Sequence, residues 1–247
     1  MYFELVGTNV RVMGSMHMLP KDRPNMPNWV LRAYEWADAL VTEIDPGRVG
    51  DIFSLPPGQE LKPLLPDDLW ASIESFWPRN RIPLNSLRPW ALPLLIPVFC
   101  TRLVDGVEPL FMGKAALDGK AVGFLERGID FAATAETIPS SEIIEATRTL
   151  MADLDAPAKQ IEAIWAAWVI GDLTSLYATV RTMPIFSQQG LRNALLTKRN
   201  RAWAEVLRPS LASAERTLVF VGALHLCGPD NLLDCLGRRV RVLPIEA

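Results

Sequence analysis

Short stretches of apolar residues predict β-strands at both ends of the chain. Residues 3–5 and 10–12 alternate between apolar and polar side chains and flank the turn sequence at 7–9, which predicts a hairpin. The second of these strands continues into residues 14–17, Gly-Ser-Met-His. Near the C-terminus, residues 216–221 form another apolar stretch, which runs into Gly-Ala-Leu-His.

A helical pattern separates these strands. Asn28 can cap a helix with apolar positions at helical spacing, and a short strand follows at 39–44. Strand, helix and strand in this order form a βαβ unit, which favours parallel pairing. From about 60 to 214 the pattern is mostly helical, with one inserted strand near 120–126. A last strand is expected at 240–243.

These elements predict an α/β fold: a central mixed sheet from N- and C-terminal βαβ-like units, with a large helical middle. The 247 residues, 49% of them apolar, suffice for one substantial core. We therefore expect a single domain over 1–247, in which 1–50 and 215–247 form the sheet core.

Composition and charge narrow the classes of function. A net charge of −3 does not favour a nucleic-acid partner, which usually needs a basic face. The apolar stretch from Trp90 to Cys100 is too short and too interrupted by prolines to span a bilayer, so we expect no membrane span. The start of the chain lacks a signal peptide, which predicts a cytoplasmic protein, or an exported one if a signal has been removed. Three cysteines without a C-x-x-C pair argue against a disulfide framework.

Histidine occurs only twice, at His17 and His225, and both copies follow an apolar strand in a Gly-x-x-His turn. The glycines Gly14 and Gly222 permit a sharp turn or a close approach of the backbone. Ligand sites of α/β proteins lie at the carboxyl ends of parallel strands, so the two imidazoles are expected to converge at one rim. The alternative interpretation of each histidine is a satisfied core side chain.

Carboxylates could complete a metal site at this rim. Glu43 and Glu126 each end an apolar strand. Two histidines with one or two glutamates suit Zn, Mn or Co and leave a position open for water, which such a metal activates for hydrolysis. Glu43 is expected to be a ligand or the general base. Ser15, two residues before His17, is an alternative nucleophile with His17 as its base.

Several stretches together resemble the TraB/GumN family, which also contains the Tiki proteases. The stretches are 14–17 (GSMH), 40–45 (LVTEID), 119–126 (GKAVGFLE), 198–203 (KRNRAW) and 221–226 (VGALHL). The resemblance covers nearly the whole chain. It implies a fold like that of the erythromycin esterases and the haem-binding ChaN lipoproteins. Relatives often have Gly-x-Asp where this chain has Gly106-Val107-Glu108.

The same resemblance changes the interpretation of Arg199 and Asn200. From the pattern alone they lie on a solvated helix face, whereas the resemblance implies site residues that orient substrate or stabilise an oxyanion. It also supports Glu126 as a site residue. The Tiki branch is associated with metal-dependent peptide cleavage, so the leading hypothesis is a divalent-metal hydrolase of peptidase type, acting on a peptide or a small molecule.

Two other functions stay open. One is a metal-free, esterase-like hydrolase in which a histidine is the general base. The other is a protein that binds haem or a small ligand without turnover, with histidine as an axial ligand. An apolar region at 88–112 could support a homodimer.

Overall fold

The computed structural model describes residues 1–22, 26–45, 52–79 and 81–245. Its strands are β1 (Tyr2–Leu5), β2 (Val10–Ser15), β3 (Met18–Pro20), β4 (Ala39–Thr42), β5 (Leu103–Asp105), β6 (Ala121–Phe124), β7 (Thr217–Gly222) and β8 (Val240–Val242). Its longer helices are α1 (Asn28–Trp36), α3 (Asp67–Phe76), α4 (Leu92–Cys100), α5 (Val107–Asp118), α6 (Gly128–Ala135), α7 (Ser140–Ala152), α8 (Ala156–Val169), α9 (Leu173–Val180) and α12 (Lys198–Leu207).

Shorter helical segments connect these elements. They are α10 (Pro184–Ser187), α11 (Gln189–Arg192), the π-helical turn η5 (Asn193–Thr197), the 3₁₀ turn η7 (Ala223–Leu226) and α13 (Leu232–Leu236). Helix α1 begins at Asn28 as expected, but Pro27 occupies the cap position and no side chain caps the helix.

The central sheet has the strand order β6-β4-β7-β2-β1-β8. The four strands from β6 to β2 are parallel, and the β1–β2 and β1–β8 pairs are antiparallel. Every residue of β7 is buried, as expected for a strand covered on both faces. The predicted mixed α/β fold and the N-terminal hairpin are therefore confirmed.

One feature of this sheet was not predicted. Strands β2 and β4 are parallel, but β7 from the C-terminal region lies between them and pairs with both. As a result, the carboxyl ends of β6, β4, β7 and β2 all lie along one edge of the sheet, although they come from distant parts of the chain.

A second, two-stranded sheet of β3 and β5 was also not predicted. Gly106 follows β5 and donates its N–H to the carbonyl oxygen of His17 at 3.0 Å. A Cβ atom on Gly106 would lie 2.0 Å from the carbonyl oxygen of Met16, so only glycine permits this approach. The contact brings the start of α5 against the end of β2.

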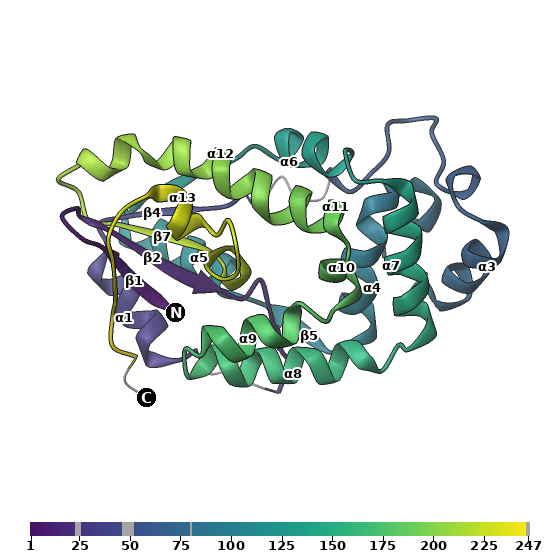
Figure 1. Cartoon of the computed structure of the whole chain (residues 1–247), viewed down its shortest axis with the longest axis horizontal. Helices are drawn as coiled ribbons and strands as arrows, with labels where there is room; N and C mark the ends of the chain where they lie inside the picture. The colour runs from purple at the N-terminus through teal and green to yellow at the C-terminus, as the bar shows by residue number, and fades with distance from the viewer. Residues whose placement is uncertain (23–25, 46–51, 80, 246–247) are drawn as a thin grey trace.

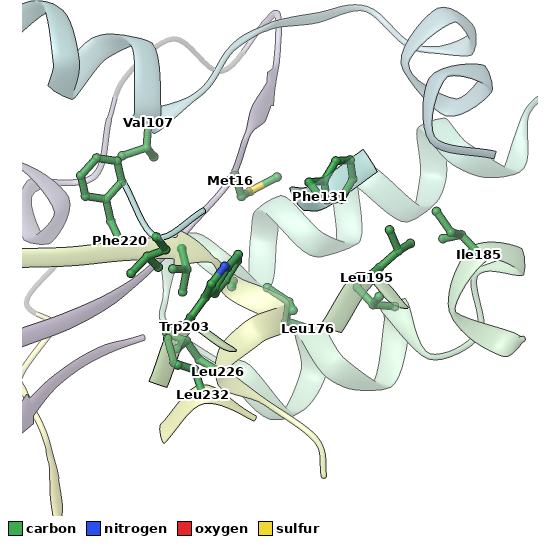
Figure 2. Packing of buried hydrophobic residues seen from close by; sticks show 14 of the residues in the cluster. Met16, Val107, Phe131, Leu176, Ile185, Leu195, Trp203, Phe220, Leu226 and Leu232 are labelled. Atoms are coloured by element: carbon green, nitrogen blue, oxygen red, sulfur yellow. The ribbon is translucent and has the colours of Figure 1, made fainter. Parts of the chain in front are cut away.

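Helices α5 and α12 of the helical middle lie against the sheet, whereas the other long helices of this region extend away from it (Figure 1). Figure 1 shows the strands and both chain termini at one end of the molecule, with α3, α4 and α7 at the other. The core is continuous between these parts. In Figure 2, Val107 and Phe220 lie on one side of β7, and Leu226 and Leu232 lie on the other. Among the described residues, no helix is long and apolar enough to cross a membrane.

One buried hydrogen bond ties the helical middle to the sheet. The indole N–H of Trp168, in α8, donates to the carbonyl oxygen of Gly14 at 2.8 Å. Trp168 is fully buried and its ring lies 5.4 Å from that of Trp29.

We expect Trp168→Phe to lower the free energy of unfolding by about 1–3 kcal/mol, because the Gly14 carbonyl would stay buried without its donor. Chemical denaturation measures the change. Trp165→Phe, in the same helix and without this bond, removes a similar volume and should cost less. An equal cost for both variants would contradict this role of the bond.

Candidate active site

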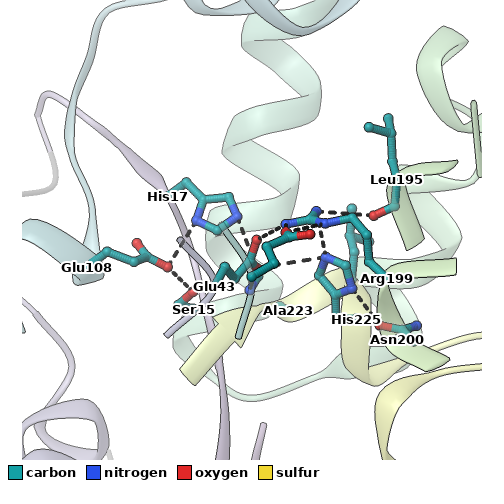
Figure 3. Close-up of polar contacts among 12 residues, drawn as sticks. Ser15, His17, Glu43, Glu108, Leu195, Arg199, Asn200, Ala223 and His225 are labelled. Atoms are coloured by element: carbon teal, nitrogen blue, oxygen red, sulfur yellow. Dashed lines mark hydrogen bonds and ion pairs between the residues drawn. The ribbon is translucent and has the colours of Figure 1, made fainter. Parts of the chain in front are cut away.

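The edge where the four parallel strands end carries the charged side chains of the site. His17 follows β2 by two residues, and Glu43 follows β4 directly. Glu126 follows β6 by two residues, and His225 lies in η7, immediately after β7. Figure 3 shows that His17, Glu43 and His225 point toward one another, so the two histidine turns meet as their sequence contexts predicted.

The guanidinium of Arg199, in α12, lies at the centre of this group. Nη2 donates to Glu43 Oε2 at 2.7 Å, and Nε donates to Glu126 Oε1 at 2.7 Å. Nη1 donates to the carbonyl oxygen of Leu195 at 3.2 Å and approaches His225 Nε2 at 3.3 Å. Nη2 also pairs with Glu126 Oε1. All three nitrogens of the guanidinium therefore have partners within the site.

The side chain of Arg199 is 9% exposed, and the rings of Phe131 and Trp203 lie 4.8 and 4.4 Å from its Cζ. A buried cation of this kind is stable only when its surroundings compensate its charge. The carboxylates of Glu43 and Glu126 provide that compensation, and they outweigh burial and raise the pKa of Arg199.

Asn200 fixes the orientation of His225. The amide Nδ2 of Asn200 donates to the carbonyl oxygen of Asp230 at 2.8 Å, which leaves Oδ1 as the acceptor for His225 Nδ1–H at 2.6 Å. His225 Nε2 therefore carries the lone pair that faces Arg199 and Glu43. Asn200 is 1% exposed and lies behind His225, not on the cavity wall.

His17 belongs to a second hydrogen-bonded group. Its Nδ1–H donates to Glu108 Oε1 at 2.9 Å, and the hydroxyl of Ser15 donates to the same oxygen. Its Nε2 faces Glu43 Oε1 at 3.5 Å. Ser15 thus bonds to Glu108, and no bond joins its hydroxyl to His17 among the described contacts.

Glu108 is the site residue that the sequence reasoning missed. It lies in the first turn of α5, and the approach of Gly106 to the end of β2 brings it to His17. The one signal in the sequence was the Gly106-Val107-Glu108 stretch, which has a carboxylate where relatives have Asp but gave no indication of a partner.

The two histidines have opposite protonation. Burial would lower the pKa of His17, but the carboxylates of Glu108 and Glu43 outweigh it and raise the pKa to about 9. Burial lowers the pKa of His225, and the cations of Arg199 and His17 act in the same direction, so it falls to about 3 despite Glu43. Near neutral pH, His17 is an imidazolium and His225 is neutral.

The two glutamates also differ. Burial opposes the charged form of Glu43, but His17 and Arg199 outweigh it, and the N–H of Gly222 donates to Oε1 at 2.6 Å. The pKa of Glu43 therefore lies well below its usual range. For Glu126, burial outweighs the effect of Arg199 and raises the pKa.

The glycines of the two turns allow this close packing. A Cβ atom on Gly222 would lie 2.8 Å from His17 Nε2 and 3.3 Å from Glu43 Oε1. A Cβ atom on Gly14 would lie 3.0 Å from the Cβ of Ala223. Gly222 in particular makes room for the imidazole beside the carboxylate.

His17, Glu43, Arg199 and His225 line a cavity of about 370 Å³. The side chain of His17 is 55% exposed, whereas those of Glu43, Arg199 and His225 are nearly buried. Glu126 lines a neighbouring cavity of about 610 Å³ instead. Pockets of this size commonly bind small molecules.

The predicted metal site meets an obstacle in this arrangement. The described residues contain no group of three or more His, Cys, Asp or Glu side chains arranged to hold a metal ion. Arg199 already contacts two of the expected ligands, Glu43 and His225. With Arg199 in contact with Glu43 and His225, the described side chains form no metal site as they lie, and the metal stays a prediction.

The chain matches the model of the TraB/PrgY/gumN family over residues 4–240. It is 25% identical over 234 residues to an uncharacterized protein, YbaP, of Escherichia coli (strain K12), covering 91% of this chain and 86% of that protein. The uncharacterized protein YbaP of Shigella flexneri matches with the same identity and coverage. No solved structure matches significantly. The resemblance inferred from the motifs is thus confirmed.

We expect the two histidines to titrate far apart, His17 near pH 9 and His225 near pH 3. Imidazole proton shifts measured by NMR against pH report both values, and a His225→Gln variant assigns the peaks because the chain has only two histidines.

Glu108→Gln removes a carboxylate from His17 and should lower its pKa toward the ordinary value of about 6.5. Glu205→Gln, on an exposed part of α12, is the control and should leave the pKa unchanged. A pKa near 6.5 for His17 in the unmodified protein would contradict the described geometry.

Proposed function

Because the chain belongs to the TraB/PrgY/gumN family, we propose that it is a hydrolase that cleaves an amide or ester bond in the cavity at the strand ends. One observation carries the proposal. The imidazolium of His17 and the carboxylate of Glu43 face each other across 3.5 Å on the wall of a cavity of about 370 Å³. At neutral pH this pair places a group that can give a proton beside one that can accept a proton, which is the arrangement of acid–base hydrolysis.

In the proposed reaction Glu43 is the general base and His17 is the general acid. Glu43 takes a proton from a water molecule while the water oxygen bonds to the carbonyl carbon of the substrate. His17 Nε2–H gives its proton to the leaving oxygen or nitrogen as the acyl bond breaks. The net reaction consumes one water and forms an acid and an alcohol or amine.

The same distance supports recovery of the starting state. After turnover Glu43 would be protonated and His17 neutral. Since Glu43 Oε1 and His17 Nε2 lie 3.5 Å apart, the proton can return from the carboxyl to the imidazole directly or through one water. Glu108 would keep the ring of His17 in position throughout, because its bond to Nδ1 leaves Nε2 directed at the reacting group.

Arg199, His225 and Asn200 are positioning residues in this proposal. All three guanidinium nitrogens of Arg199 contact other groups of the protein, which favours a role in positioning those groups. Arg199 holds Glu43 Oε2, and Oε1, which accepts the N–H of Gly222, is the oxygen that faces His17. The neutral imidazole of His225 is oriented by Asn200, and its Nε2 lies 3.8 Å from Glu43 Oε1.

A second candidate is the metal-dependent peptidase expected from the sequence. The observation in its favour is that Nε2 of His17 and Nε2 of His225 lie 3.5 and 3.8 Å from one oxygen, Glu43 Oε1. Atoms that bind one tetrahedral Zn at about 2.0–2.2 Å are roughly that far apart. Such a metal would activate a water, but it would have to displace Arg199 from Glu43 and His225.

We expect Glu43→Gln and His17→Gln each to lower kcat by about 10²–10⁴-fold, because each removes one proton-transfer group. A panel of nitrophenyl esters and peptide amides, first used to find a turned-over substrate, provides the assay. Glu205→Gln is the matched control and should keep full activity. Turnover that survives in both site variants, or a Soret band on adding haem with no turnover of any substrate, would contradict the hydrolase.

The pH profile after chelation separates the two candidates. If His17 is the acid, activity needs its protonated form, so kcat/KM should fall as pH rises through about 9 and should survive a chelator. A metal-dependent enzyme would lose activity on chelation and recover it with Zn, Mn or Co. Elemental analysis of the purified protein, with and without His17→Ala and His225→Ala, completes the comparison.

A further inference from the structure

We propose that the substrate of this hydrolase carries an uncharged apolar acyl chain, which occupies the cavity beside His17 and Glu43. This inference rests on the proposed function, because it names the substrate class of the same site. It follows from three features of the cavity: the composition of its walls, the position of its polar groups and its size.

The walls of the cavity are apolar over most of their extent. Helices of the middle region contribute Leu94, Phe131, Ile164, Leu176, Val180 and Leu195. Figure 2 shows that Met16, Phe131, Leu176 and Leu195, from elements distant in sequence, converge on one region. A cavity with such walls gains free energy mainly by taking up apolar surface.

The polar groups gather at one end. Apart from backbone atoms, the polar side chains among the described lining residues are Ser15, His17, Glu43, Arg199 and His225. His17, Arg199 and His225 each lie next to Glu43, and Ser15 bonds to Glu108, which also holds His17. These side chains come from the carboxyl ends of β2, β4 and β7 and from α12. The reacting bond therefore belongs at this end, and the chain attached to it extends toward the helices.

The charged side chains that line the cavity already have partners in the protein, which excludes an acyl chain that carries a charge. Arg199 is held by Glu43 and Glu126, and His17 by Glu108 and Glu43. No other Lys or Arg and no other Asp or Glu is among the described lining residues. A carboxylate or ammonium on the chain would thus be buried without a partner, which is costly.

The size of the cavity limits the length of the chain. A volume of about 370 Å³ corresponds to roughly a dozen spaces of about 30 Å³, each the size of a water molecule and similar to a methylene group. With a few of these spaces left for the carbonyl group and the attacking water, an acyl chain of about eight to ten carbons would fill the rest. Acetyl would leave most of it empty, and palmitoyl would exceed it.

The test measures kcat/KM for nitrophenyl esters of acetyl, butyryl, octanoyl, decanoyl and palmitoyl groups. We expect kcat/KM to rise by up to about fourfold for each methylene added, as far as octanoyl or decanoyl, because each buried methylene contributes about 0.8 kcal/mol. It should then fall for palmitoyl.

A matched pair of variants tests whether the acyl chain lies beside Leu94. Leu94 lines the cavity, whereas Leu95, next to it in α4 and also half-buried, does not. Leu94→Trp should move the optimum to a shorter acyl group and lower the decanoyl-to-butyryl ratio by about tenfold or more. Leu95→Trp should leave the ratio unchanged. Thermal unfolding checks that both variants fold.

Binding separates this inference from the hydrolase itself. Decanamide, an uncharged acyl amide, is titrated calorimetrically into the unmodified protein and both variants. If Leu94→Trp abolishes binding and Leu95→Trp retains it, the result supports an acyl chain in this cavity. If no ester is hydrolysed at the same time, only the proposal of hydrolysis is contradicted. Ester hydrolysis that does not depend on chain length would overturn the inference and leave the hydrolase. Absence of decanamide binding would also overturn it.

Discussion

The arrangement of this site depends on one buried cation, the guanidinium of Arg199. Its side chain joins three others that follow neighbouring strands: Glu43 after β4, Glu126 after β6 and His225 after β7. Removing a cation from water costs several kcal/mol, so Arg199 is stable here only because two carboxylates and a carbonyl receive its N–H groups. Conversely, Arg199 is the cation that contacts both of these buried glutamates. Fold and site thus constrain each other.

The backbone around Arg199 fits this role. The π-helical turn η5 immediately precedes α12, and the carbonyl of Leu195 within this turn accepts a hydrogen bond from the guanidinium. Single π-helical turns occur often at functional sites, because they shift side chains relative to a regular helix. On the opposite wall, Gly106 brings α5 and Glu108 to His17. Two separate ion-pair groups therefore meet at Glu43, one from each side.

The sequence alone predicted much of this architecture. Periodicity predicted the apolar strands at both ends, the inserted strand near 120–126 and the helical middle. The repeated Gly-x-x-His context predicted that His17 and His225 lie at one edge of the sheet, where both are next to Glu43. Three features of the structure could not be predicted from the sequence. The insertion of β7 between β2 and β4 is a choice of strand order that periodicity does not encode. Strands β3 and β5 are too short to give a pattern. The third feature is the position of Arg199 between the two glutamates. Arg199 and Glu126 are 73 residues apart in the sequence, and the residues around Arg199 predict a solvated helix face.

The measurement that tests this account most directly is the cost of removing the cation with and without its anions. In the unmodified chain, Arg199→Met should lower the free energy of unfolding by about 3–5 kcal/mol, because Glu126 would stay buried without its cation and Glu43 would keep only His17 and the N–H of Gly222. In a Glu43→Gln, Glu126→Gln background the same substitution should cost much less, since no buried anions remain beside it. Denaturant unfolding of the four proteins gives both values. An equal cost in the two backgrounds would contradict the claim that Arg199 is the charge on which the site is built.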